Sequence, residues 1–272
     1  MSDKTLPWRL EEVDFSPLKA ELVQGNERLF YLVGIASFVE SLSDLYTQNL
    51  IEHYASDEEA CLWLQEHWEP EELQHGKALR AYAEAVWPDF AWEEAWKRFA
   101  ADYGAVCTKE CLEPSRALEM AARCVVETGT STFYRALMQA ASDEPVLCAI
   151  CAKIRSDEVR HFKYFLNFFH RYQEKEKNSF FKVMKTLTRR VTEVRQDDTF
   201  YAYRALKLGL HPEQPFSQDE FKSFFSSLRR FLHPHYPHRQ AAEMLLSPLP
   251  APSSFKARFL RPVAEAVVRR VI

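Results

Sequence analysis

The chain has 272 residues, of which 47% are hydrophobic and 27% charged, with only 6 glycines. A chain of this length can bury the core of one large domain, and its composition favours helix. The first twelve residues are rich in charge and no apolar run reaches about 18 residues, so we expect neither a secretory signal nor a membrane-spanning helix. The six cysteines are then expected to stay reduced in a cytoplasmic protein.

Helical periodicity, capping patterns and prolines divide the first part of the chain into six predicted helices. A Ser-Asp-Glu-Glu capping box starts the second helix, and Pro70 and Pro114 open later ones. The sequence shows no β pattern, so the predicted fold is all-α. The predicted helices are 17–54, 56–67, 70–88, 89–111, 114–142 and 145–175.

The remainder of the chain is predicted to continue as helices at 180–208 and 217–232, the second capped by Ser217. A stretch rich in proline and histidine (233–238) follows, and an amphipathic, basic segment (255–272) ends the chain. The chain is therefore divided into three predicted parts: an N-terminal segment, 1–16, a helical bundle, 17–176, and a C-terminal helical extension packing on the bundle, 177–272.

Charge is unevenly distributed, although the net charge is only -4. Residues 222–272 carry nine lysines and arginines against Glu243 and Glu265. Basic and aromatic residues do not interleave in a recognisable motif, so no nucleic-acid partner is predicted. The basic region could bind an acidic protein or an anionic membrane surface. Alternatively, its last amphipathic segment simply covers the bundle.

A repeated arrangement of glutamate and histidine is the strongest functional signal in the sequence. In each copy a lone glutamate is followed 31 or 32 positions later by Glu-x-x-His, whose two side chains share one helical face. One glutamate on each of two helices and Glu-x-x-His on each of two others is the di-iron carboxylate arrangement. The six predicted metal ligands are Glu40, Glu72, His75, Glu127, Glu158 and His161.

Isolated Glu-x-x-His pairs arise by chance, and most glutamates lie on solvated helix faces. The surroundings of two of these glutamates argue against that interpretation. Glu40 follows ten uncharged residues (30–39), and Glu158 shares a helical stripe with Leu147 and Phe165. A carboxylate on an apolar stripe is costly unless it is paired or metal-bound. The alternatives are therefore a metal site and a network of buried ion pairs.

Mixed carboxylate and imidazole ligation suits iron, and six protein ligands for two ions leave positions open for O2. Our hypothesis is that Glu72 and Glu158 bridge two iron ions, that Glu40 and Glu127 each bind one, and that each histidine supplies one nitrogen. Because ligand sets overlap, a manganese–iron pair remains an alternative. Without metal, four converging carboxylates would take up protons, so metal affinity is expected to rise with pH.

Residues next to these ligands are candidates for supporting roles. Asp157 and Asp44 could orient the histidines through the ring N–H that does not face the metal. Thr130 and Ser131, one turn after Glu127, could place a hydroxyl over the open face of the metals. Thr130 and Asp157 are the two residues that we predict to take part in catalysis.

Three further motifs allow metal or redox interpretations that the sequence does not favour. Cys148 and Cys151 form C-x-x-C inside a predicted helix with no second copy beside it, which is typical of a buried thiol pair. Cys124 lies one turn before Glu127 and could face the metals or simply pack. The histidines of 233–238 could bind a metal, although such turns usually lie at the surface.

The sequence around the repeat resembles that of the soluble acyl-acyl-carrier-protein desaturases of the ferritin-like superfamily. Residues 68–76 are similar to their Trp-x-x-Glu-Glu-x-x-His-Gly stretch, 156–161 to their Asp-Glu-x-Arg-His motif, and Glu127 with Thr130 to their glutamate and threonine. The resemblance covers about residues 28–170 and not the C-terminal extension. It implies a ferritin-like four-helix bundle, a homodimer and a di-iron cluster. An external donor, a ferredoxin or a reductase, would reduce this cluster, which then uses O2 to remove hydrogen from an unactivated C–H bond.

Four functions are compatible with such a site. The first is desaturation or hydroxylation of a fatty-acyl substrate, carried on an acyl carrier protein that binds the basic tail with Arg189 and Arg190. The second is oxygenation of a polar amine or aromatic acid, for which Arg123 or Arg135 would bind the acid. The third is a ferroxidase or iron-binding protein without organic substrate, and the fourth is a metal-free scaffold. Four aromatic residues could wall an acyl channel or be plain core: Phe162, Phe165, Phe168 and Phe169.

Overall fold

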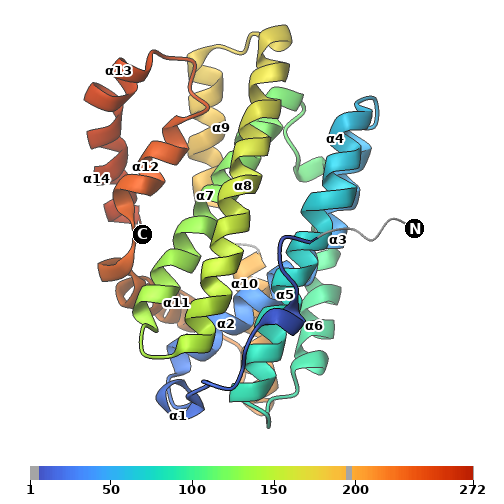
Figure 1. Ribbon diagram of the computed structural model, residues 1–272, viewed down its shortest axis with the longest axis vertical. Coiled ribbons are helices and arrows are strands. Elements are labelled where there is room, and N and C mark those ends of the chain that lie inside the picture. The colour runs from blue at the N-terminus through green and yellow to red at the C-terminus, as the bar shows by residue number, and fades with distance from the viewer. Residues whose placement is uncertain (1–5, 194–197, 272) are drawn as a thin grey trace.

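The computed structural model describes residues 6–193 and 198–271, and every regular element in these ranges is helical (Figure 1). The predicted all-α fold is therefore confirmed for the described residues. The α-helices in chain order are α1 Ala20–Val23, α2 Glu27–Glu40, α3 Ser43–His53, α4 Glu58–Trp63, α5 Glu69–Val86, α6 Trp92–Gly104, α7 Arg116–Ala140, α8 Pro145–Glu176, α9 Phe180–Glu193, α10 Asp198–Leu210, α11 Gln218–Leu232, α12 His238–Leu246, α13 Ser253–Phe255 and α14 Arg261–Val271. Short 3-10 or π-helical segments are η1 Leu10–Glu12, η2 Leu64–Trp68, η3 Lys109–Cys111, η4 His233–His235 and η5 Lys256–Leu260.

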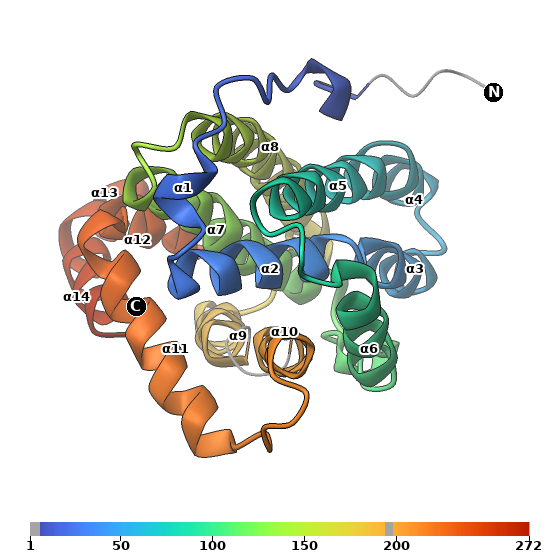
Figure 2. The same ribbon diagram turned by 90° about the horizontal axis from the view of Figure 1, so that it is seen from below.

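Four helices meet at the centre of the molecule. α7 and α8 run side by side, α2 packs against α5, and α5 contacts α8 (Figures 1 and 2). Fully buried apolar side chains such as Phe38, Leu79 and Ile154 lie between them. An amphipathic helix gains most of its stability from burying such a face. Because these helices also carry the repeated glutamates and histidines, the packing that buries the apolar core brings the motifs together.

Residues 17–54, predicted as one helix, are divided into α1, α2 and α3. Asn26 caps α2, because its side chain accepts a hydrogen bond from the Leu29 amide at 3.3 Å. After α2, the Ser43 hydroxyl donates to the Glu40 carbonyl at 2.7 Å, and α3 continues at 41° to α2. Short polar side chains compete in this way with helical backbone hydrogen bonds. The chain therefore bends immediately after the first predicted ligand.

Residues 58–86, predicted as two helices, form one continuous helical run through η2. The run is capped by Asp57, which accepts a hydrogen bond from the Ala60 amide at 3.1 Å, and not by the predicted Ser56. Pro70 lies in the first turn of α5, directly after the π-helical turn. A proline inside a continuous helix lacks an N–H and crowds the preceding turn, which accounts for the widened turn at this point.

Several later boundaries also differ from the prediction. α6 ends at Gly104, whereas the predicted helix ends at residue 111, and the chain continues through the short η3. The predicted helix over 180–208 corresponds to α9 and α10, and residues 194–197 between them lie outside the described part. Ser217 caps α11 as predicted, accepting a hydrogen bond from the Glu220 amide at 3.5 Å. The sequence does not predict α12. It follows a proline-rich stretch, which usually indicates a loop, but Pro237 directly precedes the first residue of this helix.

The elements after α8 share their core with those before it. α9 and α12 pack on α7, α10 packs on α2 and α6, and α14 packs on α12 (Figure 2). The buried Val183 and Leu206 belong to the same apolar clusters as the central helices. The amphipathic segment at 253–271 packs along one side only and leaves four apolar side chains exposed: Phe255, Phe259, Val263 and Val267.

In the described ranges, no single helix is both long and apolar enough to cross a membrane. α2 and α3 taken together would meet that criterion by length and composition, across their 41° bend. The residues of α2 are mostly buried against neighbouring helices, which is typical of a core helix.

Gly76 should be required for the close contact of α5 with the bend after α2. A Cβ atom at this position would lie 2.5 Å from Ser41 Oγ and 2.7 Å from the Ser41 backbone nitrogen. We expect Gly76→Ala to lower the free energy of unfolding by about 1–3 kcal/mol, the usual cost of overpacking. Gly129→Ala is the matched control, because its Cβ would meet no atom within 4 Å. It should be neutral or stabilising by up to about 1 kcal/mol. Urea unfolding that ranks the two variants the other way would contradict this assignment.

Candidate metal centre

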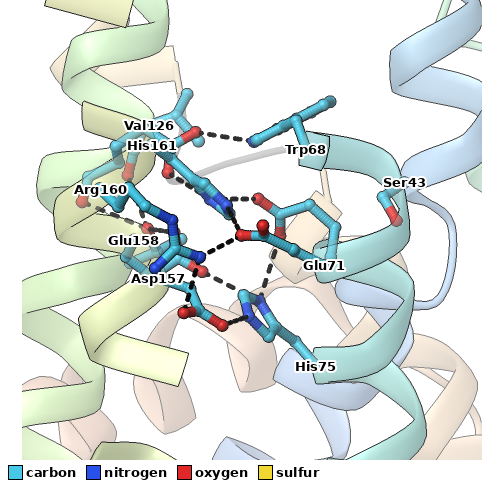
Figure 3. Close-up of polar contacts among 12 residues, drawn as sticks. Ser43, Trp68, Glu71, His75, Val126, Asp157, Glu158, Arg160 and His161 are labelled. Carbon is cyan, nitrogen blue, oxygen red and sulfur yellow. Dashed lines mark hydrogen bonds and ion pairs between the residues drawn. The ribbon is translucent and has the colours of Figure 1, made fainter. Parts of the chain in front are cut away.

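The six predicted ligands come together inside the central helices. Figure 3 shows His75, Glu158 and His161 among them. Each is buried, with at most 7% of the residue exposed. Glu40 ends α2, and the other five lie within α5, α7 and α8. Their ligand atoms form two groups that could each hold a metal ion. These groups, here called the metal-ligand cluster, are Glu40, Glu72, His75 and Glu158, and Glu72, Glu127, Glu158 and His161.

Glu72 and Glu158 belong to both groups, as bridging carboxylates must. The Nδ1 atom of His75 lies 3.2 Å from Glu158 Oε1 and 3.5 Å from Glu72 Oε2. Correspondingly, His161 Nδ1 lies 3.1 Å from Glu72 Oε1 and 3.7 Å from Glu127 Oε2. Each histidine therefore directs the same ring nitrogen into the cluster.

The opposite nitrogen of each histidine contacts the acidic residue that precedes the ligand glutamate of the other motif. His75 Nε2 lies 3.0 Å from Asp157, and His161 Nε2 lies 2.8 Å from Glu71 (Figure 3). An imidazole that donates its N–H to a carboxylate at Nε2 keeps a lone pair on Nδ1, which is the form that binds metal. The two motifs thus orient one another reciprocally.

Arg160 and Trp8 support these two carboxylates. The Arg160 guanidinium bonds to Glu71 and, at 2.8 Å, to Asp157. The Trp8 indole N–H donates to Asp157 at 2.7 Å, and its ring stacks near that of His75 with centroids 6.1 Å apart. Burial disfavours the ionised form of Asp157, but hydrogen bonds from His75 and Trp8 outweigh burial and lower the pKa of this carboxyl. Asp157 is therefore an ionised acceptor for the histidine.

Three hydrogen bonds hold the ligand carboxylates themselves. The Thr130 hydroxyl donates to Glu158 Oε2 at 2.6 Å, and the Tyr134 hydroxyl donates to Glu40 Oε1 at 2.6 Å. The Trp68 indole donates to Glu127 Oε1 at 3.3 Å. Thr130 and Asp157, the two residues predicted to take part in catalysis, thus both contact members of the cluster.

Two other predicted supporting residues do not reach the cluster. Asp44 is exposed and accepts from the amide of the next residue at 2.8 Å, because the bend after α2 turns it away. The Ser131 hydroxyl donates to the Thr128 carbonyl at 3.3 Å. Ser131 is rotated by about 100° around α7 from Thr130, and this rotation removes it from the face that carries the ligands.

Sequence reasoning missed five residues that support the cluster, among them Trp68, whose partner Glu127 is 59 residues away in the sequence. Glu71 precedes a ligand glutamate as Asp157 does in the second copy, so a comparison of the two copies could have found it. Arg160 lies within the second motif, but its role depends on which carboxylates approach it. Trp8 and Tyr134 are 149 and 94 residues from their partners in the sequence, and no local pattern indicates either contact.

The remaining candidate motifs lie outside both ligand groups. Cys148 and Cys151 are free thiols, and Cys148 Sγ contacts the carbonyls of Met138 and Ala141. Cys124 is buried in an apolar cluster beside the site. The histidines of 233–238 join neither of the ligand groups found among the described residues.

Burial and mutual repulsion set the protonation of the metal-free cluster. Burial, followed by the charge of Glu72, raises the pKa of Glu40 well above its ordinary 4.5, and burial with the charge of Glu158 does the same for Glu127. The pKa of Glu72 is lowered instead, because hydrogen bonds with His161 and other neighbours outweigh its burial. Without metal the cluster therefore holds protons that a cation would displace.

Four buried polar atoms of the cluster have no hydrogen-bond partner among the described residues. Such atoms are rare in folded proteins, and their concentration at one place calls for a ligand. Carboxylate oxygens and imidazole nitrogens are the donors that divalent transition metals accept. The residues present therefore fit metal binding. The four atoms are Nδ1 of His75, Nδ1 of His161, Oε2 of Glu127 and Oε1 of Glu158.

A cavity of about 400 Å³ opens beside the cluster. Its lining includes the ligand glutamates and Thr130, and also Arg123 together with Arg189 and Arg190 from α9. Its volume lies in the range of small-molecule sites. The aromatic residues considered as a channel wall are packed in an apolar cluster and do not line this cavity: Phe162, Phe165, Phe168 and Phe169.

Comparison with protein-family models finds no match to this chain, and comparison with curated proteins finds none either.

Replacing a glutamate shared by both ligand groups should remove metal binding. Glu158→Ala deletes an oxygen donor from each group and leaves both histidines without that neighbour. After anaerobic reconstitution with ferrous iron and desalting, we expect the variant to retain much less metal per chain than the wild type. His238→Ala, in α12 and outside both groups, is the control and should retain wild-type metal. Equal metal content in the two variants would contradict the ligand assignment.

The stability of the metal-free protein should fall as pH rises. Burial lowers the pKa of both ligand histidines, but the neighbouring carboxylates, Asp157 foremost for His75 and Glu127 for His161, accept hydrogen bonds from the protonated rings, outweigh burial and raise the pKa well above 6.5. Their contribution is complete below pH 6.5 and is lost as pH rises through the raised pKa. The raised pKa values of Glu40 and Glu127 also make the metal-free protein less stable as the pH rises above 4.5.

Glu72 has the opposite effect on stability, but only in acid. Because its pKa is lowered, its contribution to stability is complete above pH 4.5 and is lost as the pH falls below that value. The measurement is the melting temperature of chelator-treated and metal-loaded protein across neutral pH. As the pH rises, we expect the melting temperature of the chelator-treated protein to decrease. The difference in melting temperature between the treated and the metal-loaded protein should therefore widen. A gap that narrows with rising pH would argue against proton displacement by metal.

Proposed function

We propose that this protein is an O2-dependent oxidoreductase with a di-iron carboxylate centre. The observation that carries the proposal is the pair of overlapping ligand groups, in which two shared glutamates are flanked by one further glutamate and one histidine on each side. We infer that α2, α5, α7 and α8 form a ferritin-like four-helix bundle around it. This inference is supported by the mutual packing of the four helices and by the resemblance to soluble acyl-acyl-carrier-protein desaturases.

The donor set supports iron. Four carboxylates carry a formal charge that two divalent ions balance, and one imidazole per ion leaves positions that O2 can occupy. A manganese–iron pair would accept the same donors and is part of the proposal as an alternative. When bound, the metal pair would supply the electrons and the binding site for O2 activation.

The chain's own residues would orient the ligands and exclude water. Asp157 and Glu71 hold the two histidines with Nδ1 toward the cluster. Thr130 donates to Glu158 from the side of the cavity, so its hydroxyl lies where a substrate and a shared glutamate meet. Such a hydroxyl can hold or pass a proton as the carboxylate changes its partners.

The cavity supports an organic substrate over a simple ferroxidase. An iron-oxidising site needs only space for ions and O2, whereas about 400 Å³ lies beside this cluster. C–H oxidation, by desaturation or hydroxylation, therefore remains the proposed reaction. A fatty-acyl substrate is one candidate. The arginines in the cavity lining give specific support to the second candidate, oxygenation of a substrate that carries an acid group.

The partners of the proposed reaction are an external electron donor and O2. An electron donor or an acyl carrier protein is commonly acidic, and the exposed stripe of 253–271 is flanked by basic residues such as Arg258 and Arg270. This supports docking of an acidic protein or of an anionic membrane surface on the C-terminal helices. A homodimer is proposed from the family resemblance alone.

Metal content and O2 consumption test the proposal together. We expect about two iron ions per chain after anaerobic reconstitution, as two ligand groups require. We also expect O2 uptake, on addition of a chemical reductant, that is faster than in Glu127→Ala. Protein that binds no iron or manganese would refute the di-iron proposal and favour a scaffold with a buried ion-pair network. Protein that binds iron and converts it to the ferric form, but oxidises no acid, amine or acyl substrate, would support the ferroxidase alternative.

A further inference from the structure

The C-terminal segment 253–271 has two apolar faces, and the protein covers only one of them. Leu260 and Ala264 pack against the apolar cluster of α7, α8 and α9, and Val268 is 5% exposed. The side chains of the other face are 43% to 63% exposed. These residues, here called the exposed stripe, are Phe255, Phe259, Val263 and Val267. The exposed stripe therefore adds nothing to the core of the described residues.

The residues of the exposed stripe are spaced by four along the helical segment. Side chains with this spacing lie above one another on a single helix face. From Phe255 to Val267 the segment extends roughly 18 Å at the rise of an α-helix. The stripe is thus a long and narrow apolar surface and not a set of scattered exposed side chains.

Basic side chains flank the exposed stripe. The segment 253–271 carries five lysines and arginines against a single glutamate, Glu265. Two of the five are paired, Arg261 with Glu243 at 3.2 Å and Arg269 with Glu265 at 2.8 Å. The other three have no carboxylate partner among the described residues: Lys256, Arg258 and Arg270.

Two of these unpaired charges lie close to the exposed stripe. The Arg258 guanidinium lies 5.5 Å from the ring centroid of Phe259. Arg270 follows Val267 by three residues, a spacing that places both on one helix face. The same surface therefore presents apolar side chains and positive charge that the chain itself does not neutralise.

We propose that the exposed stripe inserts into the surface of an anionic lipid bilayer, with the flanking basic residues on the lipid phosphates. A helix that lies in a membrane interface buries its apolar face about 5–10 Å deep and keeps lysine and arginine beside it. Each such basic residue adds attraction to anionic lipids. The inference rests on the proposed function, because it names the surface on which the proposed enzyme works and where acyl chains are present.

The stripe suits a bilayer better than it suits a protein partner. A second copy of the chain would bring the same unpaired positive charges together. Four apolar side chains are also few beside the about 20–30 residues per side of a stable interface. An acidic protein would compensate the charges, but it would also need an apolar groove that matches the stripe. A bilayer accommodates an apolar stripe of any shape.

Cosedimentation with lipid vesicles tests the inference. Vesicles of phosphatidylcholine are compared with vesicles that contain about one quarter phosphatidylglycerol, an anionic lipid. We expect the wild-type protein to bind the anionic vesicles at least about tenfold more tightly, because its unpaired basic residues attract them. Raising the salt concentration from about 0.1 M to about 0.5 M should weaken this binding without abolishing it, since salt screens charge and not apolar contact. Chelator-treated and metal-loaded protein should bind alike.

Two double variants separate the apolar and the electrostatic parts of binding. Phe259→Ser/Val263→Ser should weaken binding to anionic vesicles by about tenfold or more and remove the part that resists salt. Arg258→Gln/Arg270→Gln should weaken it by about 25-fold at low salt, about fivefold for each charge, and reduce the preference for anionic lipid. All four side chains are exposed, so the melting temperature of both variants should stay close to that of the wild type.

Matched controls change the same kinds of residue on the other side of the molecule. Leu62→Ser removes an apolar side chain of α4 that is 45% exposed. Lys77→Gln/Lys97→Gln removes two exposed positive charges from α5 and α6. These helices lie across the molecule from α14 (Figures 1 and 2). Both controls should bind anionic vesicles as the wild type does.

The outcomes separate this inference from the proposed function. No vesicle binding, equal binding to neutral and anionic vesicles, or undiminished binding by the two double variants would overturn it. Without vesicle binding, self-association that Phe259→Ser/Val263→Ser abolishes would assign the stripe to a second copy, and binding of purified acyl carrier protein would assign it to an acidic protein. Either result would also overturn the inference. Wild-type protein that binds anionic vesicles but no metal would refute the di-iron proposal and still support the membrane surface.

Discussion

The burial of four carboxylates and two imidazoles at one point is the constraint on which the rest of this structure depends. Each ionised group would be costly there unless charge and hydrogen bonds compensate it. The surroundings supply hydrogen bonds to some atoms and leave others, including Nδ1 of His75 and His161, without a protein partner. The centre of the molecule is therefore compatible with two states: a protonated, metal-free cluster and a metal-filled one. The raised pKa values of Glu40 and Glu127 are the electrostatic signature of the first state.

The reciprocal contacts between the two Glu-x-x-His motifs explain why the central helices need a defined register. Asp157 reaches the histidine of α5 while Glu71 reaches that of α8, and Arg160 connects the two acids. A shift of one residue along either helix would rotate its side chains by about 100° and break these contacts together. Because the acids hold Nε2, the metal-facing nitrogens are oriented before any metal binds. Such preorganisation would suit the proposed binding of two metal ions in a fixed geometry.

The elements outside the four central helices contact two different sides of this centre. Residues 6–16 lie over α5 and α8, where they bring Trp8 to Asp157 (Figure 2). On the cavity side, α9 supplies Arg189 and Arg190, and η3 supplies Glu110. The ligand helices thus define the chemistry, while later elements define what can reach it. This division is consistent with a resemblance to known di-iron proteins that is confined to the ligand region, since related centres act on different substrates.

The sequence by itself determined the helical character of the described residues, the cap at Ser217 and the set of ligand candidates, because these depend on patterns within a few residues. Glu72 and His75 share a face for that local reason, and the repeat at Glu158 indicates the same chemistry. The break after α2 and the π turn before Pro70 depend on hydrogen bonds and crowding that periodicity does not register. Only the tertiary structure decided which acid orients which histidine, that Trp8 joins them, and that arginines face the cavity. These contacts join segments distant in the sequence, and their energies are set by burial in the folded chain.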